Sequence, residues 1–305
     1  MGKGFELLGK EHIDTFCEAL KISENEIEKV YVNPGRSANN TNFVIATQED
    51  SYLYRIPGSG TDKFCSRANE ALAYETLASL KITDEVIYLS KDTGIKISKY
   101  YENSRIPYND NKNELFSSMQ TLRRLHNLDI KFPHVDSLFD RMKRYRKFAL
   151  DVGGEIYYLE GFSDYYNSMM EFEDNVKNTT IKKCFTHGDA SINNFLITNE
   201  HPYPILIDME FPAMSHPFDD IATFCVDAEY RKNDILLMTE YYLERKPSPF
   251  EQYHILGLCS VAAMMWYSWA VYKSAVEENN KLFLDFRNDY HKYVEEVYSE
   301  AIKVL

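Results

Sequence analysis

Residues 185–211 hold polar side chains whose types and spacing suit phosphoryl transfer. The stretch reads FTHGDASINNFLITNEHPYPILIDMEF, with Asn194 five residues after Asp189 and Asp208 nineteen residues after it. This reaction needs a carboxylate to accept or orient the proton of the attacking hydroxyl, and oxygen ligands for Mg²⁺. Protein kinases use the same spacing of Asp and Asn, followed by a magnesium-binding Asp. The spacing therefore predicts a phosphotransferase.

Each of these residues alone has a simpler structural explanation. A lone Asp in a loop is usually a turn or capping residue, and adjacent asparagines such as Asn193-Asn194 are common in turns. A lone His is usually structural. The combination of His187-Gly188-Asp189, Asn194 and Asp208 at the end of an apolar run is much harder to obtain by chance, so we favour the kinase interpretation.

The same stretch resembles the catalytic centre of the choline/ethanolamine kinase and aminoglycoside phosphotransferase superfamily. Asp208-Met209-Glu210-Phe211 is similar to the Asp-Phe-Glu-Tyr segment of choline kinases, with Phe211 where the family typically has Tyr. Residues 215–222, SHPFDDIA, resemble the family's Phe-Asp-Ile-Gly/Ala segment. Asp227 stands where the family usually carries Glu. The resemblance implies a two-lobed protein-kinase-like fold of the α+β class.

The resemblance also implies a role for each matching position. Asp189 would be the catalytic base, and Asn194 and Asp208 would hold Mg²⁺. Glu210 could take part in metal or water coordination. Three further residues would support the catalytic loop: His187, Asp220 and, from the Leu-His pair that ends a helical segment, His126.

The nucleotide site is expected in the N-terminal third. There is no Walker A sequence and no GxGxxG, so a P-loop NTPase is excluded. Residues 34–43, PGRSANNTNF, resemble the family's phosphate loop and could approach ATP with backbone amides. The loop residues that we expect to bind ATP are Asn39, Asn40, Thr41 and Asn42, although a polar hairpin is nearly as good an interpretation of this segment alone.

A kinase also needs a cation on the phosphates, fixed by a carboxylate. Arg55 in the predicted strand 52–56 fits the family's Leu-Arg segment. Glu70 fits its carboxylate partner, and Glu75 on the same helix is the alternative. Tyr100 would belong to the adenine hinge, by position only. The sequence does not distinguish ATP from GTP.

The acceptor site is predicted on the helix of residues 257–275. Trp266 and Trp269 are the two tryptophans of the chain, and three-residue spacing puts them on one helix face. Aromatic faces hold a quaternary ammonium by cation–π attraction, although spacing alone favours a buried core helix. Choline kinases carry a similar Trp-x-x-Trp, which turns the prediction towards a choline site of Trp266, Trp269, Tyr272, Phe211 and Asp227.

Three alternatives to a choline kinase remain open at this point. A kinase for ethanolamine or another amino alcohol is the nearest. An aminoglycoside kinase would use acids such as those at 171–174, but it gives the Trp pair no role. A kinase-like binding protein without catalysis is disfavoured because Asp189, Asn194 and Asp208 are all intact.

The elements that must position these residues divide the chain in two. Residues 1–102 read as strands around one inserted helix, Arg67–Leu80. A polar segment at 103–113 suits a hinge. Residues 103–305 are mainly helical and end in two long helices, about Phe250–Glu278 and Lys281–Leu305. We therefore predict a small nucleotide-binding lobe and a large catalytic lobe.

Composition limits the class of protein and its partners. The chain has 305 residues and a formal net charge of −13, which gives no basic footprint for nucleic acid. Its densest basic stretch, RMKRYRK at 141–147, is interpreted as a solvated helix face. Five dispersed cysteines indicate reduced thiols. No signal peptide and no apolar run of membrane-spanning length are evident, so we expect a cytoplasmic protein, with the high Tyr and Phe content compatible with a homodimer.

Overall fold

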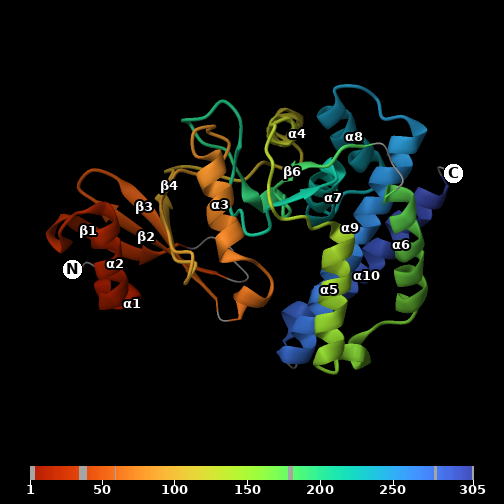
Figure 1. The fold of residues 1–305 in the computed structure, drawn as a ribbon, viewed down its shortest axis with the longest axis horizontal. Helices are drawn as coiled ribbons and strands as arrows, with labels where there is room; N and C mark the ends of the chain where they lie inside the picture. The colour runs from red at the N-terminus through yellow and green to blue at the C-terminus, as the bar shows by residue number, and fades with distance from the viewer. Residues whose placement is uncertain (1–3, 34–39, 59, 178–180, 278–279, 304–305) are drawn as a thin grey trace. The chain divides into compact units, whose positions relative to one another are not determined.

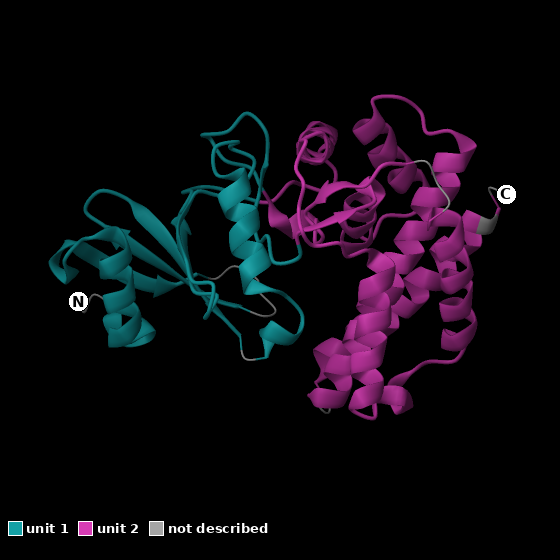
Figure 2. Ribbon diagram, in the orientation of Figure 1, with its two compact units in different colours: residues 1–105, 196–211 teal, residues 106–195, 212–305 magenta. Residues whose placement is uncertain are grey.

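The computed structural model describes residues 4–33, 40–58, 60–177, 181–277 and 280–303, and it separates into two compact units. The first unit contains residues 1–105 and 196–211, and the second contains residues 106–195 and 212–305 (Figure 2). The predicted division at residue 102 therefore lies near the first boundary. It did not anticipate that residues 196–211 return to the first unit.

The first unit is built on a five-stranded antiparallel sheet with the strand order β1-β2-β3-β5-β4 (Figure 1). The strands are β1 (Ile27–Val32), β2 (Asn40–Thr47), β3 (Ser51–Pro57), β4 (Val86–Leu89) and β5 (Lys96–Lys99). The β2–β3 turn is closed by Thr47, whose backbone amide and hydroxyl both donate to the Asp50 carbonyl. The sheet and one inserted helix match the predicted organisation of this part of the chain.

The described part of this unit also contains the helices α1 (Phe5–Leu8), α2 (Lys10–Leu20) and α3 (Arg67–Leu77). Ile13 and Phe16 of α2 are fully buried in one core with Ile45, Tyr54 and Ile97 of the sheet. Ser66 caps α3 by accepting from the Asn69 amide, 3.3 Å away. Capping fixes where α3 begins, and hence which residues occupy its first turn.

Residues 196–211 complete the first unit. The short strand β8 (Ile205–Leu206) follows β7 (Phe195–Leu196), and the two pair. Leu206 also exchanges backbone hydrogen bonds with the segment before β4, accepting from Asp84 and donating to Ile82. These bonds place the residues after β8, including Asp208, beside α3 and the sheet.

The second unit is mainly helical and contains a small two-stranded antiparallel sheet. Its helices are α4 (Lys112–His126), α5 (Leu138–Asp151), α6 (Phe162–Lys177), α7 (Pro217–Asp227), α8 (Lys232–Leu243), α9 (Pro249–Val276) and α10 (Lys281–Ile302), and its paired strands are β6 (Cys184–Thr186) and β9 (Ala213–Ser215). Helix α9 packs against α5, α7 and α10. The α+β organisation predicted from the sequence is thus confirmed.

Helix α9 is long and apolar enough to cross a membrane by length and composition, contrary to the expectation that no run reaches this length. Its most apolar 18-residue window has a mean hydropathy of 1.4, and 94% of that window is buried inside the structure. A helix that is hydrophobic on all sides and covered by neighbouring helices is a core helix. Its length is therefore explained by packing in the second unit.

Candidate active site

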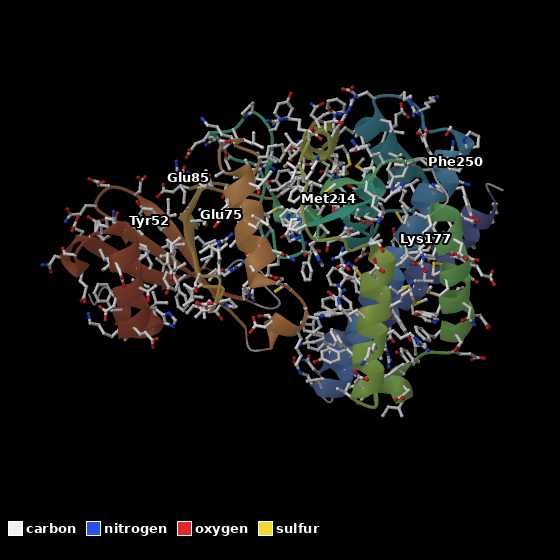
Figure 3. All side chains as sticks on the ribbon, in the orientation of Figure 1. Tyr52, Glu75, Glu85, Lys177, Met214 and Phe250 are labelled. Atoms are coloured by element: carbon white, nitrogen blue, oxygen red, sulfur yellow. The ribbon has the colours of Figure 1, made fainter. Side chains whose placement is uncertain are left out.

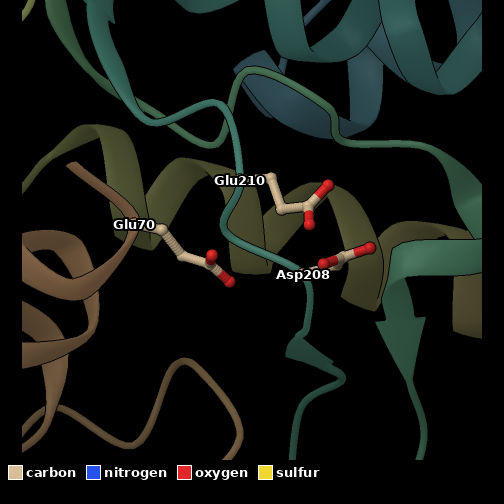
Figure 4. Close-up of side chains that lie close together, drawn as sticks. All are labelled: Glu70, Asp208 and Glu210. Carbon is tan, nitrogen blue, oxygen red and sulfur yellow. The ribbon is translucent and has the colours of Figure 1, made fainter. Parts of the chain in front are cut away.

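The first unit holds a cluster of charged side chains, all buried except the partly exposed Asp208, which we call the charge cluster: Arg55, Arg67, Glu70, Asp208 and Glu210. Strand β3 supplies Arg55, α3 supplies Arg67 and Glu70, and the turn after β8 supplies the other two. Figure 4 shows its three carboxylates lying close together. Arg55 and Glu70 are 3% and 0% exposed. Charges this far from water are stable only when paired.

Arg55 connects the two parts of the unit. Its guanidinium lies 2.7 Å from a Glu70 oxygen, 2.9 Å from Asp208 Oδ1 and 3.5 Å from Glu210 Oε1. The pairing of Arg55 with Glu70 is the one expected from the sequence. Glu75, the alternative partner, lies on the exposed side of α3 (labelled in Figure 3), where it pairs with Lys91 at 2.9 Å.

Arg67 is the member of the charge cluster that sequence reasoning missed. Its guanidinium donates to Glu210 Oε1 at 2.8 Å and lies 3.3 Å from Glu70. It also donates to the Thr61 hydroxyl at 2.6 Å. The one available signal was its place three residues before Glu70, a spacing that brings two side chains together on a helix.

The charge cluster has the donor set that Mg²⁺ prefers. One oxygen each from Glu70, Asp208 and Glu210 lie within 4.8 Å of one another, and no other such group occurs among the described residues. Three carboxylates and two guanidiniums leave one net negative charge. Burial, and then the neighbouring Asp208 charge, raise the pKa of the Glu210 carboxyl. A hard cation with oxygen ligands would relieve that excess of negative charge.

The predicted phosphate-loop residues lie at the start of β2 where the structure describes them. Asn40, Thr41 and Asn42 pair in register with Pro57, Ile56 and Arg55 of β3. The Asn40 amide group donates to Glu210 Oε1 at 3.4 Å. Asn39 lies outside the described residues. Asn40 and Asn42 are thus brought to the same end of the sheet as the charge cluster.

Two further predicted residues of the first unit lie away from these contacts. Tyr100 follows β5, and its backbone amide donates to the Ser51 carbonyl at 2.9 Å. This bond holds the predicted hinge to the adjacent strand β3. Phe211, predicted for the acceptor site, is the last residue of the first unit and is half-buried.

The second unit contains the predicted catalytic loop, residues 187–194. Asp220, fully buried on α7, accepts hydrogen bonds from the backbone amides of His187 and Gly188, both at 2.8 Å. The Asp189 amide donates to the His187 ring at 3.2 Å. Asn194 donates through Nδ2 to the Asp189 carbonyl at 2.8 Å and lies 3.3 Å from its carboxylate. The Asn194 side-chain oxygen is therefore the atom that could bind a metal.

Behind this loop a chain of polar groups fixes Asp220. His126 Nε2 lies 2.9 Å from Asp220 Oδ2, and His126 Nδ1 lies 2.9 Å from the Tyr242 hydroxyl. Burial by itself would raise the pKa of the Asp220 carboxyl, but hydrogen bonds to its charged form, above all from His126, outweigh burial and lower this pKa. Asp220 therefore stays ionised as an acceptor, which agrees with the supporting positions expected for His126 and Asp220.

Arg141 contributes to the loop in a way that the sequence did not predict. It is 2% exposed, and its guanidinium donates to the Gly188 carbonyl. The interpretation of residues 141–147 as a solvated face is therefore wrong for Arg141. Its helix neighbours are also paired, with Arg144 bound to Asp136 at 2.7 Å and Lys143 to Glu173 at 2.7 Å. A basic run looks solvated in a sequence because its partners are distant in the chain.

Asp227, predicted at the acceptor site, also bonds within the catalytic loop. Its Oδ2 accepts from the Ser191 hydroxyl at 2.6 Å and from the Asn193 amide group at 2.9 Å. Burial raises the pKa of Asp227 in spite of these bonds. Asp227 thus ties the end of α7 to the loop that carries Asp189.

The tryptophans begin a row of aromatic rings on α9 and α10. Trp266 and Trp269 meet edge to face, with centroids 5.8 Å apart. Trp269 lies 6.5 Å from Phe286, and Phe286 lies 6.2 Å from Tyr290. Tyr272, also predicted here, is buried and lies 6.0 Å from Phe148 of α5.

Tyr290, at the end of the aromatic row, is subject to charges on and near the predicted catalytic loop. Burial, and then the negative charges of Asp227 and Asp189, raise the pKa of its hydroxyl. Sequence reasoning missed Tyr290 and Phe286. The signal was present, since Phe283, Phe286 and Tyr290 recur at the spacing of one helix face. One end of the aromatic row is thus under the electrostatic influence of two carboxylates.

Comparison with known proteins identifies relatives over most of the chain. The sequence model described as choline/ethanolamine kinase matches residues 24–257. Protein LicA of Haemophilus influenzae is 25% identical over 259 residues, covering 81% of this chain and 93% of its own length.

Two solved structures share the fold. Choline kinase LicA from Streptococcus pneumoniae superposes with a TM-score of 0.77 at 20% identity, covering 95% of this chain and all of that one. A LicA structure in complex with AMP superposes with a TM-score of 0.74 at 20% identity, covering 95% and 98% of the two chains.

Proposed function

Because the chain belongs to the choline/ethanolamine kinase family, and is therefore a small-molecule kinase, we propose that it transfers the γ-phosphate of ATP to the hydroxyl of choline. The observation that carries the choice of choline is the aromatic row of Trp266, Trp269, Phe286 and Tyr290, whose last ring is subject to the negative charges of Asp227 and Asp189. A trimethylammonium group donates no hydrogen bond, so it is recognised by aromatic faces and by negative charge.

Asp189 is the proposed catalytic residue. Its backbone is held by the His187 ring and its carbonyl by Asn194. Its carboxylate would accept the hydrogen bond of the choline hydroxyl and orient the oxygen for in-line attack on the γ-phosphorus. The supports from Asp220 and Arg141 reduce the motion of this loop, which favours a productive geometry.

Asp208, Glu210 and Asn194 are the proposed magnesium ligands. Mg²⁺ would neutralise charge that develops on the phosphate oxygens. Arg55, held by Glu70, is the proposed cation on the phosphates, with Asn39, Asn40, Thr41, Asn42 and Tyr100 around the nucleotide. The oxygen-rich charge cluster supports this proposal, as does the relative described as a complex with AMP.

Ethanolamine is the alternative acceptor, because the family contains kinases for both alcohols. A primary amine is bound by hydrogen bonds and carboxylates, and Asp227 already shares its carboxylate with Ser191 and Asn193. This geometry favours choline over ethanolamine. We also propose that the protein acts in the cytoplasm, without nucleic acid, and that any assembly is a homodimer.

The decisive experiment is an assay of ADP release with ATP and Mg²⁺, comparing choline, ethanolamine and kanamycin. We expect turnover with choline to exceed that with the other two. In Trp266→Ala the choline KM should rise about tenfold, since a desolvated cation–π contact contributes about 1–2 kcal/mol. The ethanolamine KM should change much less. Phe250→Ala, at the exposed start of the same helix, is the matched control. Equal loss for both alcohols would refute the recognition of the trimethylammonium group by Trp266.

The catalytic assignment has its own variant. Asp189→Asn should lower kcat by about 10²–10⁴-fold, because the amide cannot accept the hydroxyl proton. Nucleotide affinity, measured by titration calorimetry, should stay unchanged. Asp174→Asn, an exposed acid on α6, should turn over like the wild type. Wild-type turnover in Asp189→Asn would refute the role of Asp189.

A further inference from the structure

The first unit contains a second buried polar group that the proposed reaction does not use: Tyr74, Asp84 and Lys96. Their exposed fractions are 5%, 7% and 3%. Lys96 Nζ donates to Asp84 Oδ2 at 2.9 Å and to the Tyr74 hydroxyl at 2.8 Å, and that hydroxyl donates to Asp84 Oδ1 at 2.9 Å. A buried ion pair of this kind rarely adds stability over apolar residues of the same volume. Stability alone therefore does not explain why these three residues are present.

The Tyr74 hydroxyl has one further contact, with the turn that carries Asp208. The backbone amide of Asp208 donates to it at 3.2 Å, and that of Met209 lies 3.5 Å away. A phenol has one proton to donate and two lone pairs to accept with. The proton is donated to Asp84, and one lone pair accepts the hydrogen bond from Lys96. The remaining lone pair is therefore aimed at the Asp208 amide.

The backbone at Asp208 needs such support. Its φ is +65°, in the left-handed region that residues other than glycine seldom occupy. The Glu210 amide closes the turn on the Asp208 carbonyl at 2.8 Å. Asp84 is fixed from the same side, because its own amide donates to Leu206 at 3.2 Å. The segment around Asp84 thus holds both strand β8 and the Tyr74 hydroxyl.

We propose that Tyr74 is a positioning residue, whose hydroxyl, oriented by Lys96 and Asp84, holds the Asp208 amide in the left-handed turn and so aims the Asp208 carboxylate. The proposal rests on the proposed function in one respect, the assignment of Asp208 to Mg²⁺. Removing the hydroxyl leaves every carboxylate of the charge cluster in place. Its loss would therefore loosen the geometry of the metal site without removing a ligand.

The test compares Tyr74→Phe with Tyr54→Phe. Tyr54 is another buried tyrosine of the first unit, but its hydroxyl bonds the His12 ring at 3.0 Å. In Tyr74→Phe, amide hydrogen exchange in residues 205–211 should be about tenfold faster. The Mg²⁺ concentration for half-maximal turnover, and the affinity for Mn²⁺ followed by electron paramagnetic resonance, should weaken about tenfold or more. The choline KM should not change, and Tyr54→Phe should change none of these readouts.

The outcomes separate the inference from the proposed function. If the wild type binds Mn²⁺ but phosphorylates no alcohol, the proposed function is wrong. The role of Tyr74 would then be decided by amide hydrogen exchange and Mn²⁺ affinity alone. Wild-type exchange and wild-type metal dependence in a folded Tyr74→Phe would overturn the inference. If Tyr74→Phe does not fold, Asp84→Asn, which keeps the shape but weakens the hold on the hydroxyl, should show the same changes at smaller size. Unchanged behaviour there would equally refute it.

Discussion

At the scale of single residues, buried charges in this protein occur in compensated groups. Arg55 pairs with carboxylates from two separate segments of the chain, and Arg67 pairs with two of the same three. Removing one partner of such a group costs more than the pair contributes, because the remaining charges stay buried without compensation. The charge cluster is therefore both the proposed metal site and a condition for folding of the first unit.

This reasoning predicts a large cost for Arg55→Ala. The free energy of unfolding should fall by about 3–5 kcal/mol, since Glu70 would lose its closest cation and remain buried. Urea denaturation measures this change. The matched control is Arg245→Ala, which removes an Arg paired with Glu251 at 2.6 Å with its side chain 55% exposed, and which should unfold almost like the wild type. Similar losses in both variants would show that burial does not set the cost.

What the sequence predicted at this scale depended on separation along the chain. Asp189, Asn194 and Asp208 were found because their spacing is itself a pattern, and Arg55 and Glu70 because they match a family segment. Arg67 and Arg141 were missed because their partners, Glu210 and Gly188, lie 143 and 47 residues away. No local periodicity encodes such contacts, which arise only when the elements pack.

At the scale of elements, the sequence predicted the type of each segment better than its surroundings. The last two helices were found within a few residues of their ends, because long periodic segments carry a strong signal. The burial of α9 on all sides was harder to predict, since its neighbours α5, α7 and α10 come from other parts of the chain. The return of β8 to the first unit was missed for the same reason.

The start of α7 gives a prediction for pH. His216 caps this helix by accepting the Phe218 amide at 3.1 Å. Burial, with the His254 and His126 rings nearby, lowers its pKa to about 3, against an ordinary value near 6.5. At pH values between these two pKa values, His216 therefore gains a proton when the protein unfolds. Its contribution to stability is complete above about pH 6.5 and is lost as the pH falls towards 3.

His216→Asn keeps a capping oxygen and removes the titration. Between pH 7 and pH 5 the variant should gain about 2 kcal/mol of unfolding free energy relative to the wild type. Burial raises the pKa of Asp219 to about 7 and gives the opposite slope, but this effect is present in both proteins and cancels in the difference. Ser248→Ala, which removes the cap of α9, should cost the same at both pH values. A pH-independent difference for His216→Asn would contradict the assignment.

At the scale of the whole molecule, the first unit is discontinuous in sequence. Residues 196–211 bring Asp208 and Glu210 to Arg55 and Arg67, and Ile205, Leu206 and Met209 among them are at most 1% exposed. Burying three such side chains contributes about 5–9 kcal/mol. This amount is comparable to the whole stability of a small domain. The first 105 residues are therefore not expected to form a stable domain by themselves.

The corresponding prediction concerns two fragments. Residues 1–105 alone should unfold without a cooperative transition, because Arg55 and Arg67 would keep only Glu70 among the carboxylates of the charge cluster. Joining residue 105 to residue 196 by a short Gly/Ser linker should restore a cooperative transition, followed by circular dichroism on heating. The geometry permits the join, since Arg105 and Ile197 already exchange both backbone hydrogen bonds, at 3.1 and 2.8 Å.

A linked chain with Asp208→Asn and Glu210→Gln separates the contribution of apolar burial from that of the carboxylates. A cooperative transition that survives both changes would assign the stability to apolar burial. Loss of the transition would assign it to the carboxylates.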